Sequence, residues 1–479
     1  MDLFRQSAHA LIRLIQEKKT SPQEIAASLR ERIKQADPKL HAYVSIDGDF
    51  TVPESFERGG LSGIPLAVKD NICVAGRLTT CCSKILEGFK PPYSATVVER
   101  VIANGGYPFG RTNMDEFAFG SSTETSCYGI TRNPWDPERI PGGSSGGSVA
   151  AVAADEAIWA LGSDTGGSIR QPASLCGVVG LKPTYGRVSR YGLIAFASSL
   201  DQIGPVTKDV EDAALLLNAI GGHDAMDSTS AEVPLPDLRR SLVKDIRGVR
   251  IGVPKEYFTE GIDPEVTDII RRAIEALKSL GAEVKEVSLP HSSYAIAVYY
   301  LVATAEASSN LARFDGVRYG LREEVGDLIA SYGVTRAKGF GSEAKRRIML
   351  GTYALSSGYY DAYYLKAQKV RTLIKKDFDA AFASCDCLVG PVSPTAAFRI
   401  GEKMDDPLAM YLSDIYTIPV NLAGIPALSI PCGFTKTDLP VGLHLLTKPF
   451  DEETLFRVAY TFEQNSDFHE RKPKEYFHG

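Results

Sequence analysis

Residues 142–171 read GGSSGGSVAAVAADEAIWALGSDTGGSIRQ, and the interpretation of the whole chain starts from this stretch. Two Gly-Gly-Ser turns, at residues 142–144 and 166–168, enclose a run of small and apolar residues. Glycine permits positive φ and has no Cβ, so each turn can bring a serine hydroxyl and bare N–H groups close to a ligand. Such an arrangement can stabilise negative charge that develops beside a serine.

The alternative for both turns is a pair of flexible Gly/Ser linkers. The second turn argues against it, because Ser168 is followed by Ile-Arg-Gln and then by Pro172, and proline is tolerated in the first turn of a helix. Ser168 is therefore predicted at a helix N-terminus. There the helix dipole and the free N–H groups favour negative charge.

The composition is typical of a globular protein, with 44% hydrophobic and 23% charged residues among 479. A formal net charge of -6 argues against broad electrostatic binding of nucleic acid by this chain alone. The eight cysteines are scattered and no apolar signal segment precedes them, which predicts reduced thiols in a cytoplasmic protein. No membrane span is expected, since no apolar run reaches about 20 residues. No metal site is predicted either, because Cys385-Asp386-Cys387 lacks a second cysteine pair or a neighbouring histidine.

Hydrophobic periodicity predicts an α/β chain that forms one domain over residues 1–479. Its parts are an N-terminal helical region (1–60), a core (61–205) and a largely helical insertion (about 294–383), which is either an ordinary cover of the sheet or a substrate-binding lid. A strand, a helix and a strand at about 249–253, 263–280 and 284 onward predict a βαβ unit. Residues 182–205 are expected to wrap irregularly over the site. Further strands are predicted at 387–390, 427–430 and 441–445, with a closing helix at 451–463.

A serine nucleophile needs a base, and histidine is the commonest one. None of the seven histidines falls between residues 42 and 222, and His444, between two leucines of an apolar strand, is interpreted as a core residue. Lys69 ends the short apolar strand that begins at Ile64. Its side chain could extend to solvent, or it could be desolvated with a lowered pKa and so accept a proton. Lysine is the best base that the sequence offers.

Residues 61–205 resemble the amidase signature family in GGSSGGS, in GSDTGGSIRQPA and in their separations. This resemblance implies an amidase signature fold, with a large mixed central β-sheet covered by helices on both faces and a helical embellishment. It also implies a Ser-cisSer-Lys triad of Ser168, Ser144 and Lys69. Ser168 would attack an amide, Ser144 would relay the proton across a cis Gly143–Ser144 peptide, and neutral Lys69 would accept it. The N–H groups of Thr165, Gly166, Gly167 and Ser168 would form the oxyanion hole.

Further motifs, among them NMDEFAFGSSTE, TRNPWDPERIPGG and SDIYTIPVNLAGIPALSIP, resemble the branch of this family that supplies ammonia to tRNA-dependent amidotransferases. The resemblance implies hydrolysis of L-glutamine through an acyl-enzyme, with Tyr299, Arg347 and Asp414 binding the substrate and Tyr300 as an alternative to Tyr299. Opposite charges suit a zwitterion. Without the resemblance, a surface charge would be the simpler interpretation of Arg347 and of Asp414.

The same resemblance implies a heterotrimer. A B subunit would use ATP and Mg²⁺ to convert Glu-tRNA(Gln) to Gln-tRNA(Gln) in protein biosynthesis, a C subunit would wrap the contact, and this chain would bind no cofactor. Two departures from the family pattern are a short segment at 45–61 and His444 where glutamine is expected. A free-standing amidase for small amides and a non-catalytic scaffold remain the competing interpretations.

Overall fold

The computed structural model describes residues 2–46, 52–53, 56, 59–258 and 261–473. Its strands are β1 (Tyr43–Ile46), β2 (Pro65–Lys69), β3 (Tyr107–Thr112), β4 (Trp159–Asp164), β5 (Val179–Lys182), β6 (Gln202–Thr207), β7 (Arg250–Pro254), β8 (Glu283–Val287), β9 (Cys387–Pro391), β10 (Ala427–Phe434) and β11 (Pro440–Thr447).

The α-helices are α1 (Ala8–Gln16), α2 (Pro22–Leu40), α3 (Thr96–Ala103), α4 (Gly146–Ala153), α5 (Arg170–Cys176), α6 (Val210–Ile220), α7 (Pro264–Ser279), α8 (Ala295–Asn310), α9 (Leu328–Gly339), α10 (Ser342–Leu355), α11 (Lys366–Phe382), α12 (Pro407–Tyr411), α13 (Ile418–Ala423) and α14 (Glu452–Glu463). Short 3₁₀ turns lie at Leu3–Arg5, Lys84–Leu86, Glu116–Ala118, Leu238–Ser241, Lys255–Phe258, Ser292–Tyr294, Leu311–Arg313, Leu412–Asp414 and Phe468–Glu470, and Asp361–Leu365 is a π-helical turn.

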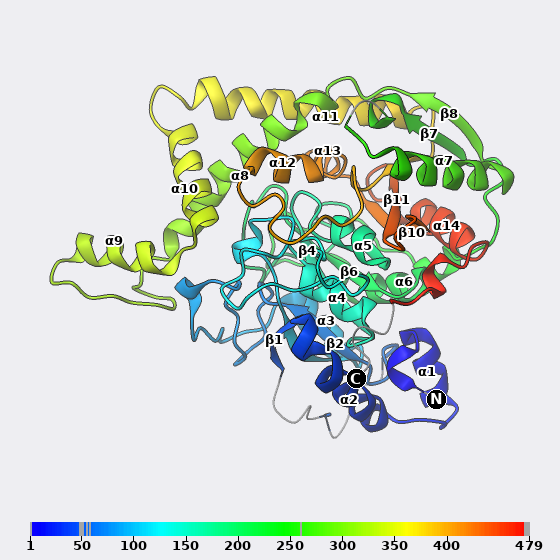
Figure 1. The fold of residues 1–479 in the computed structure, drawn as a ribbon, viewed down its shortest axis with the longest axis horizontal. Helices are drawn as coiled ribbons and strands as arrows, with labels where there is room; N and C mark the ends of the chain where they lie inside the picture. Colours follow the sequence, from blue (N-terminus) through cyan, green and yellow to red (C-terminus); the bar gives the residue numbers. More distant parts are fainter. Residues whose placement is uncertain (1, 47–51, 54–55, 57–58, 259–260, 474–479) are drawn as a thin grey trace.

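The described strands form one 11-stranded mixed sheet in the order β1-β3-β2-β4-β6-β5-β10-β11-β9-β7-β8 (Figure 1). β2 is parallel to β3 and β4, and β7 is parallel to β8 and β9. The remaining neighbours are antiparallel. The mixed sheet expected from the family resemblance is therefore confirmed, as is the parallel βαβ unit β7–α7–β8.

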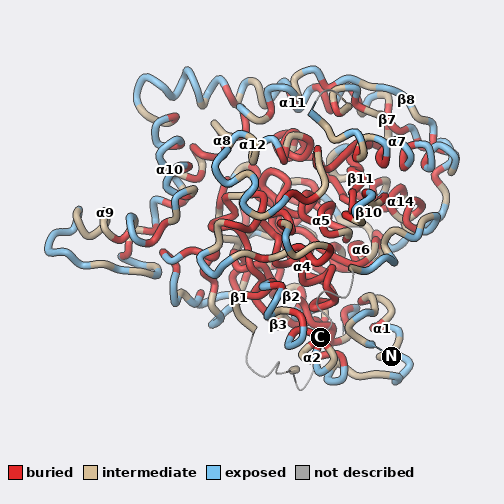
Figure 2. Tube along the Cα trace, viewed as in Figure 1, coloured by how far each residue is buried: buried red, intermediate tan, exposed pale blue. Residues whose placement is uncertain are grey.

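Helices cover both faces of the sheet, because successive side chains of a strand point to opposite faces. In β2, Leu66 and Val68 belong to a core cluster with α3, α6, α7 and α14, whereas Ala67 belongs to a second cluster with α4 and α5. Strands β2, β4, β5, β6, β9 and β11 are buried along their whole length, whereas edge strand β8 has no buried residue; Figure 2 shows the buried centre of the molecule. The position of Lys69 at the end of β2 is thus a position inside the protein.

The N-terminal region departs from its prediction in one respect. Ser21 caps α2 with a complete capping box formed with Glu24, as its sequence predicts, and Pro22 is the first helical residue. Residues Tyr43–Ile46, however, form edge strand β1 within the region expected to be helical, and they pair antiparallel with β3. Four residues are too few to show the alternation of apolar and polar side chains that predicts a strand. The short segment at 45–61 lies largely outside the described residues.

Two other stretches were also predicted imprecisely. The segment between β5 and β6 is irregular only over residues 183–201, because the ends of the predicted loop belong to the two strands. The insertion is helical in α8, α9, α10 and α11, but residues 314–327 contain no helix or strand. Figure 1 shows α9 and α10 extending away from the sheet, with α11 returning along it. Within the described residues, no helix combines the length and the apolar character needed to cross a bilayer.

Candidate active site

Lys69 is fully buried, which excludes the alternative of a side chain that extends to solvent. Its Nζ lies 2.8 Å from Ser144 Oγ, 2.8 Å from Ser145 Oγ and 3.3 Å from the Ser163 carbonyl oxygen. The Ser145 hydroxyl itself donates to Ser163 O at 3.1 Å, so Ser145 Oγ accepts from the lysine. A neutral amine has two hydrogens. With these directed at Ser145 Oγ and Ser163 O, its lone pair faces the Ser144 hydroxyl.

The surroundings of Lys69 favour that neutral form. Burial lowers the pKa of Lys69 to about 7, and the more distant carboxylates of Asp115 and Asp164 only partly oppose the shift. No described carboxylate makes an ion pair with it. At neutral pH a substantial fraction of Lys69 can therefore accept a proton.

The first glycine turn places Ser144 against this lysine. The Gly143–Ser144 peptide bond is cis, as the family resemblance implies, and Gly142 has a φ of 86°. A Cβ on Gly143 would collide with the Asp115 carboxylate, which accepts from the Thr123 N–H at 2.9 Å. Glycine is required at both positions, one for its backbone conformation and the other for its close packing.

The second glycine turn places Ser168 beside Ser144. Ser168 follows β4 and lies two residues before the first residue of α5, so the predicted place at a helix N-terminus is confirmed. The Ser145 N–H donates to the Ser168 carbonyl oxygen at 3.1 Å, which joins the two turns. Among the described residues, the Ser168 hydroxyl makes no hydrogen bond to Ser144. The structure thus links lysine to Ser144 directly and Ser168 to this pair through the backbone.

The N–H groups proposed for the oxyanion hole are not equivalent. The Gly167 N–H donates to Asp164 Oδ1 at 2.9 Å, so it is already used inside the turn, contrary to the expectation that all four groups face the substrate. The N–H groups of Thr165, Gly166 and Ser168 donate to no other group in the described part of the chain. Three of the four N–H groups, those of Thr165, Gly166 and Ser168, are therefore free to donate to a ligand.

A buried ion pair holds the second turn in this conformation. Arg170 donates from Nε to Asp164 Oδ2 at 2.9 Å and from Nη2 to Asp164 Oδ1 at 3.0 Å, and neither side chain is exposed. Although burial opposes ionisation of Asp164, the guanidinium lowers the pKa of that carboxyl below its usual range. The Arg170 Nη1 also lies 3.0 Å from Nε2 of His444. His444 is fully buried with a lowered pKa, so it is a core residue, as predicted.

Tyr299 and Asp414 lie against the glycines of the same turn. A Cβ on Gly166 would stand 2.8 Å from the Tyr299 hydroxyl, and a Cβ on Gly167 would stand 3.3 Å from Asp414 Oδ1. Tyr300, the alternative to Tyr299, instead stacks on Tyr411 with ring centroids 3.8 Å apart. This placement favours Tyr299 as the tyrosine that meets a substrate of Ser168.

Asp414 carries an oxygen that lacks a partner. It is 7% exposed, so the interpretation as a surface charge fails. The Ser121 hydroxyl donates to Oδ2, whereas Oδ1 is buried with no hydrogen-bond partner in the described residues. Burial raises the pKa of Asp414 to about 7. A cationic ligand group at Oδ1 would satisfy this oxygen and restore its charge.

Arg347 supplies the opposite charge. It is 3% exposed, and its Nε donates to Glu343 Oε1 at 2.8 Å. Four aromatic rings surround the guanidinium at 5.2–5.7 Å: Phe119, Phe196, Tyr300 and Tyr411. Arg347 also lines a pocket between α10 and α12 whose wall includes Phe119, Glu343 and Tyr411. Arg347 is the only residue of the predicted site on that wall.

Comparison with known proteins identifies the family. The amidase family model matches residues 19–456 of the chain. The chain belongs to the amidase family. An amidase family relative from Moorella thermoacetica, the A subunit of glutamyl-tRNA(Gln) amidotransferase, is 59% identical over 484 residues, which cover 99% of each chain.

Solved structures also show that this chain has the fold of the amidase family. The A subunit of glutamyl-tRNA(Gln) amidotransferase from Thermotoga maritima superposes with a TM-score of 0.84 at 45% identity, covering 97% of this chain and 96% of that one. A 6-aminohexanoate cyclic dimer hydrolase has a TM-score of 0.86 at 25% identity, covering 99% of both chains. The amidase fold expected from the sequence is confirmed.

Several residues of this amidase site were missed by the sequence analysis. Ser145 and Asp164 lie within the quoted stretch, as does Gln171, whose Oε1 accepts from the Gly143 N–H at 3.0 Å while Nε2 donates to Ser121 O at 2.9 Å. Their polar character inside a buried motif was the available signal. Ser121 lies outside the quoted stretch, in a loop whose path the sequence does not show.

One cluster in the described residues could hold a metal ion by its composition, namely His9, Asp209 and Asp212. Its carboxylates are already used: Asp212 accepts from the N–H groups of Ala8 and His9 at 2.7 and 2.8 Å, and Asp209 caps α6. Hydrogen bonds and charges from these two carboxylates raise the pKa of His9 to about 10 against its burial. In the structure, the hydrogen bonds of this cluster attach α1 to α6.

Proposed function

We propose that this amidase hydrolyses L-glutamine as the glutaminase subunit of a tRNA-dependent amidotransferase. The observation that carries the proposal is the pair of opposite, buried charges: Asp414, beside the serine turn, and Arg347, close enough to lower the pKa of Asp414 against its burial. Glutamine has an α-carboxylate and an α-ammonium group. Asp414 Oδ1 has no hydrogen-bond partner within the described residues and could accept from that ammonium group. The 59% identity to a relative named as part of an amidotransferase, against 25% to a solved hydrolase of cyclic amides, supports this reaction over that of a free-standing amidase.

In the proposed reaction, the Ser168 hydroxyl attacks the side-chain carbonyl carbon of glutamine. Its proton passes to Ser144 Oγ while the Ser144 proton passes to the lone pair of neutral Lys69, 2.8 Å away. The oxyanion of the tetrahedral intermediate accepts hydrogen bonds from the N–H groups of Thr165, Gly166 and Ser168. The returning proton makes ammonia the leaving group. Water then cleaves the glutamyl ester by the same relay and regenerates Ser168.

The ammonia serves a partner, under this proposal. A B subunit uses ATP and Mg²⁺ to activate the glutamate of Glu-tRNA(Gln) and amidates it to Gln-tRNA(Gln), a C subunit completes the heterotrimer, and this chain binds no cofactor. The names of the relatives support a multi-subunit enzyme. A net charge of -6 fits a subunit that leaves tRNA and ATP to its partner. The cytoplasm is the compartment proposed for it.

The Ser168→Ala variant tests this division of labour. In the complex with B and C partners, ATP and Glu-tRNA(Gln), ammonia release from glutamine should fall to background. Gln-tRNA(Gln) formation from added ammonium chloride should continue at the unsubstituted rate, because that step does not use the serine. If ammonium salts fail to restore Gln-tRNA(Gln), the proposed separation of roles is wrong. Rapid hydrolysis of simple amides, with little use of glutamine, would identify a free-standing amidase.

A further inference from the structure

Thr165 has a buried partner that the reaction scheme does not use. Its hydroxyl donates to Asp201 Oδ1 at 2.7 Å, and both residues are 2% exposed. The contact follows from the sheet register, since β4 ends at Asp164, β6 begins at Gln202, and these two residues are antiparallel partners. Thr165 and Asp201 are the next residues along and therefore meet just beyond the sheet.

Asp201 is itself held firmly in place. Its carboxylate accepts from the Phe196 N–H at 2.9 Å and from the Ala197 N–H at 3.1 Å. Burial raises the pKa of Asp201 to about 6, so at neutral pH the group is ionised and accepts all of these bonds. In the described part of the chain, only one hydrogen bond of this carboxylate leaves the loop, and it goes to the turn that carries Ser168.

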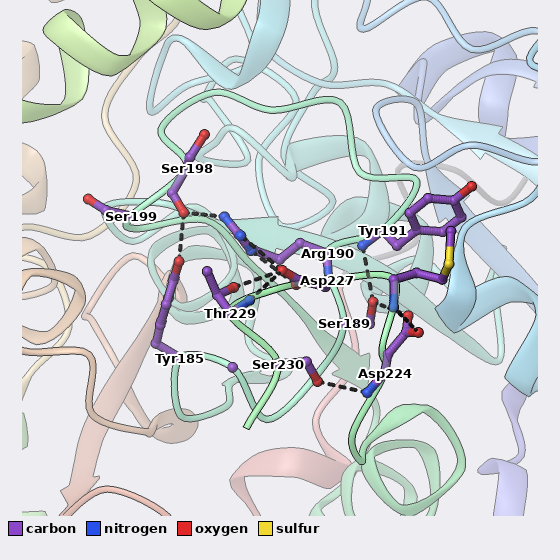
Figure 3. Close-up of polar contacts among 12 residues, drawn as sticks. Tyr185, Ser189, Arg190, Tyr191, Ser198, Ser199, Asp224, Asp227, Thr229 and Ser230 are labelled. Carbon is purple, nitrogen blue, oxygen red and sulfur yellow. Dashed lines mark hydrogen bonds and ion pairs between the residues drawn. The ribbon is translucent and has the colours of Figure 1, made fainter. Parts of the chain in front are cut away.

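The rest of the loop over residues 183–201 is anchored by a separate set of polar contacts (Figure 3). The Arg190 guanidinium pairs with both oxygens of Asp227, at 3.2 and 3.1 Å, and the Tyr185 hydroxyl donates to Ser198 O at 2.7 Å. The loop is thus fixed to the segment around Asp227 independently of Thr165. Asp201 is therefore a rigidly held acceptor for the Thr165 hydroxyl.

We propose that Asp201 is a positioning residue that orients Thr165, so that the Thr165 and Gly166 N–H groups point at the oxyanion formed on the substrate of Ser168. The inference rests on the proposed function. Tyr299 packs against Gly166, so the peptide that joins Thr165 to Gly166 is held at both of its residues. An N–H group stabilises an oxyanion only when it points at it within a narrow range of directions. An unrestrained Thr165 would therefore reduce the stabilisation of the transition state more than that of the bound substrate.

The test compares Thr165→Val with Thr165→Ser in the assembled complex, by steady-state ammonia release from L-glutamine. Valine keeps the shape but removes the hydroxyl, and kcat should fall about 10- to 100-fold, less than or equal to the loss of one oxyanion donor. KM should change by less than about threefold, because binding does not use this donor. Serine keeps the hydroxyl and should recover most of the rate.

Thr96→Val is the matched control. The Thr96 hydroxyl donates to Asp224 Oδ2 at 2.6 Å, so the same atom is removed from another threonine–aspartate bond, one that does not involve the turn of Ser168. It should leave kcat unchanged. Ammonium-dependent formation of Gln-tRNA(Gln) reports that each variant has folded and assembled, and it should be the same in all of them.

Three results would overturn the inference: a Thr165→Val kcat within twofold of the unsubstituted enzyme, equal losses in Thr165→Val and Thr96→Val, or a loss confined to KM. A failure of the proposed function is a separate outcome. In that case the unsubstituted complex would itself release no ammonia from glutamine.

Discussion

The protonation of Lys69 should set the acid limb of the glutaminase rate. With a pKa of about 7, roughly half of the lysine is neutral at pH 7 and roughly one tenth at pH 6. An unshifted lysine, at 10.5, would be neutral in only roughly one molecule in 3000 at pH 7. Since only the neutral form accepts the Ser144 proton, kcat should fall about fivefold between pH 7 and pH 6 and level off above pH 8.

The assay is ammonia release by the assembled complex at saturating glutamine, from pH 5.5 to pH 9. A second titrating group, Asp414, should make the pH profile of kcat/KM differ from that of kcat. Asp414 has a pKa of about 7 in the free enzyme and must be ionised to bind the ammonium group of glutamine. Once glutamine is bound, that ammonium keeps Asp414 ionised. The acid limb of kcat/KM should therefore approach a slope of two, while that of kcat has a slope of one.

Two substitutions of Lys69 complete this experiment. Lys69→Arg keeps the positive charge but cannot be deprotonated in a protein, so it should be nearly as inactive as Lys69→Ala at every pH. A kcat that stays level from pH 6 to pH 8 would refute the reasoning. An arginine variant with near-native turnover would refute it as well, because the proton would then go elsewhere.

Two further predictions concern charged groups around the serine turn. Asp414→Asn should raise KM for glutamine by about 10- to 100-fold, the loss expected for a charged hydrogen bond, without changing KM for a simple aliphatic amide; steady-state kinetics on both substrates checks it. Arg170→Met should lower the free energy of unfolding in urea by about 3–5 kcal/mol, because it leaves Asp164 buried without its partner. It should also abolish glutaminase activity, whereas Arg187→Met, which breaks the equally buried pair with Glu452, should lower stability similarly and retain the rate. Equal rates in the two arginine variants would contradict the role given to Arg170.

The two glycine turns and the unusual place of Lys69 could be recognised in the sequence because their constraints are local, whereas their combination into a triad came from the family resemblance. Gly143 and Ser144, or Gly167 and Ser168, are adjacent in the chain, and a backbone that must approach another group closely demands glycine wherever it occurs. Lys69 was visible as a charge that ends an apolar strand. The βαβ unit and the capping box at Ser21 were predictable for the same reason, since each depends on residues within one or two elements.

Most of the rest depends on contacts between distant segments, and one part on a local choice of hydrogen-bond acceptor. Asp201 and Thr165 are 36 residues apart, and only the register of β4 against β6 brings them together. The Gly167 N–H was assigned to the oxyanion hole because the family resemblance implies that role. The structure shows that Asp164, three residues earlier, already accepts its hydrogen. A choice between two acceptors for one N–H is decided by a few degrees of backbone rotation, which the sequence does not encode in any single residue.

Burial alone does not determine what a charged group in this site can do; its partner does. Lys69, Asp164 and Asp414 are all buried, yet within the described residues only Asp164 has a counter-ion in direct contact, and only its pKa is driven towards the charged form. Lys69 faces hydroxyl and carbonyl oxygens, which do not offset the loss of water, so its pKa moves to about 7 and it becomes a base. Asp414 has a pKa of about 7 because it is buried and no described group pairs with its Oδ1, so the free enzyme holds a carboxyl poised to ionise. Under the proposed function, an ammonium group bound at Oδ1 would convert Asp414 to the ionised, paired state of Asp164, and the site would then distinguish a zwitterionic amide from a neutral one.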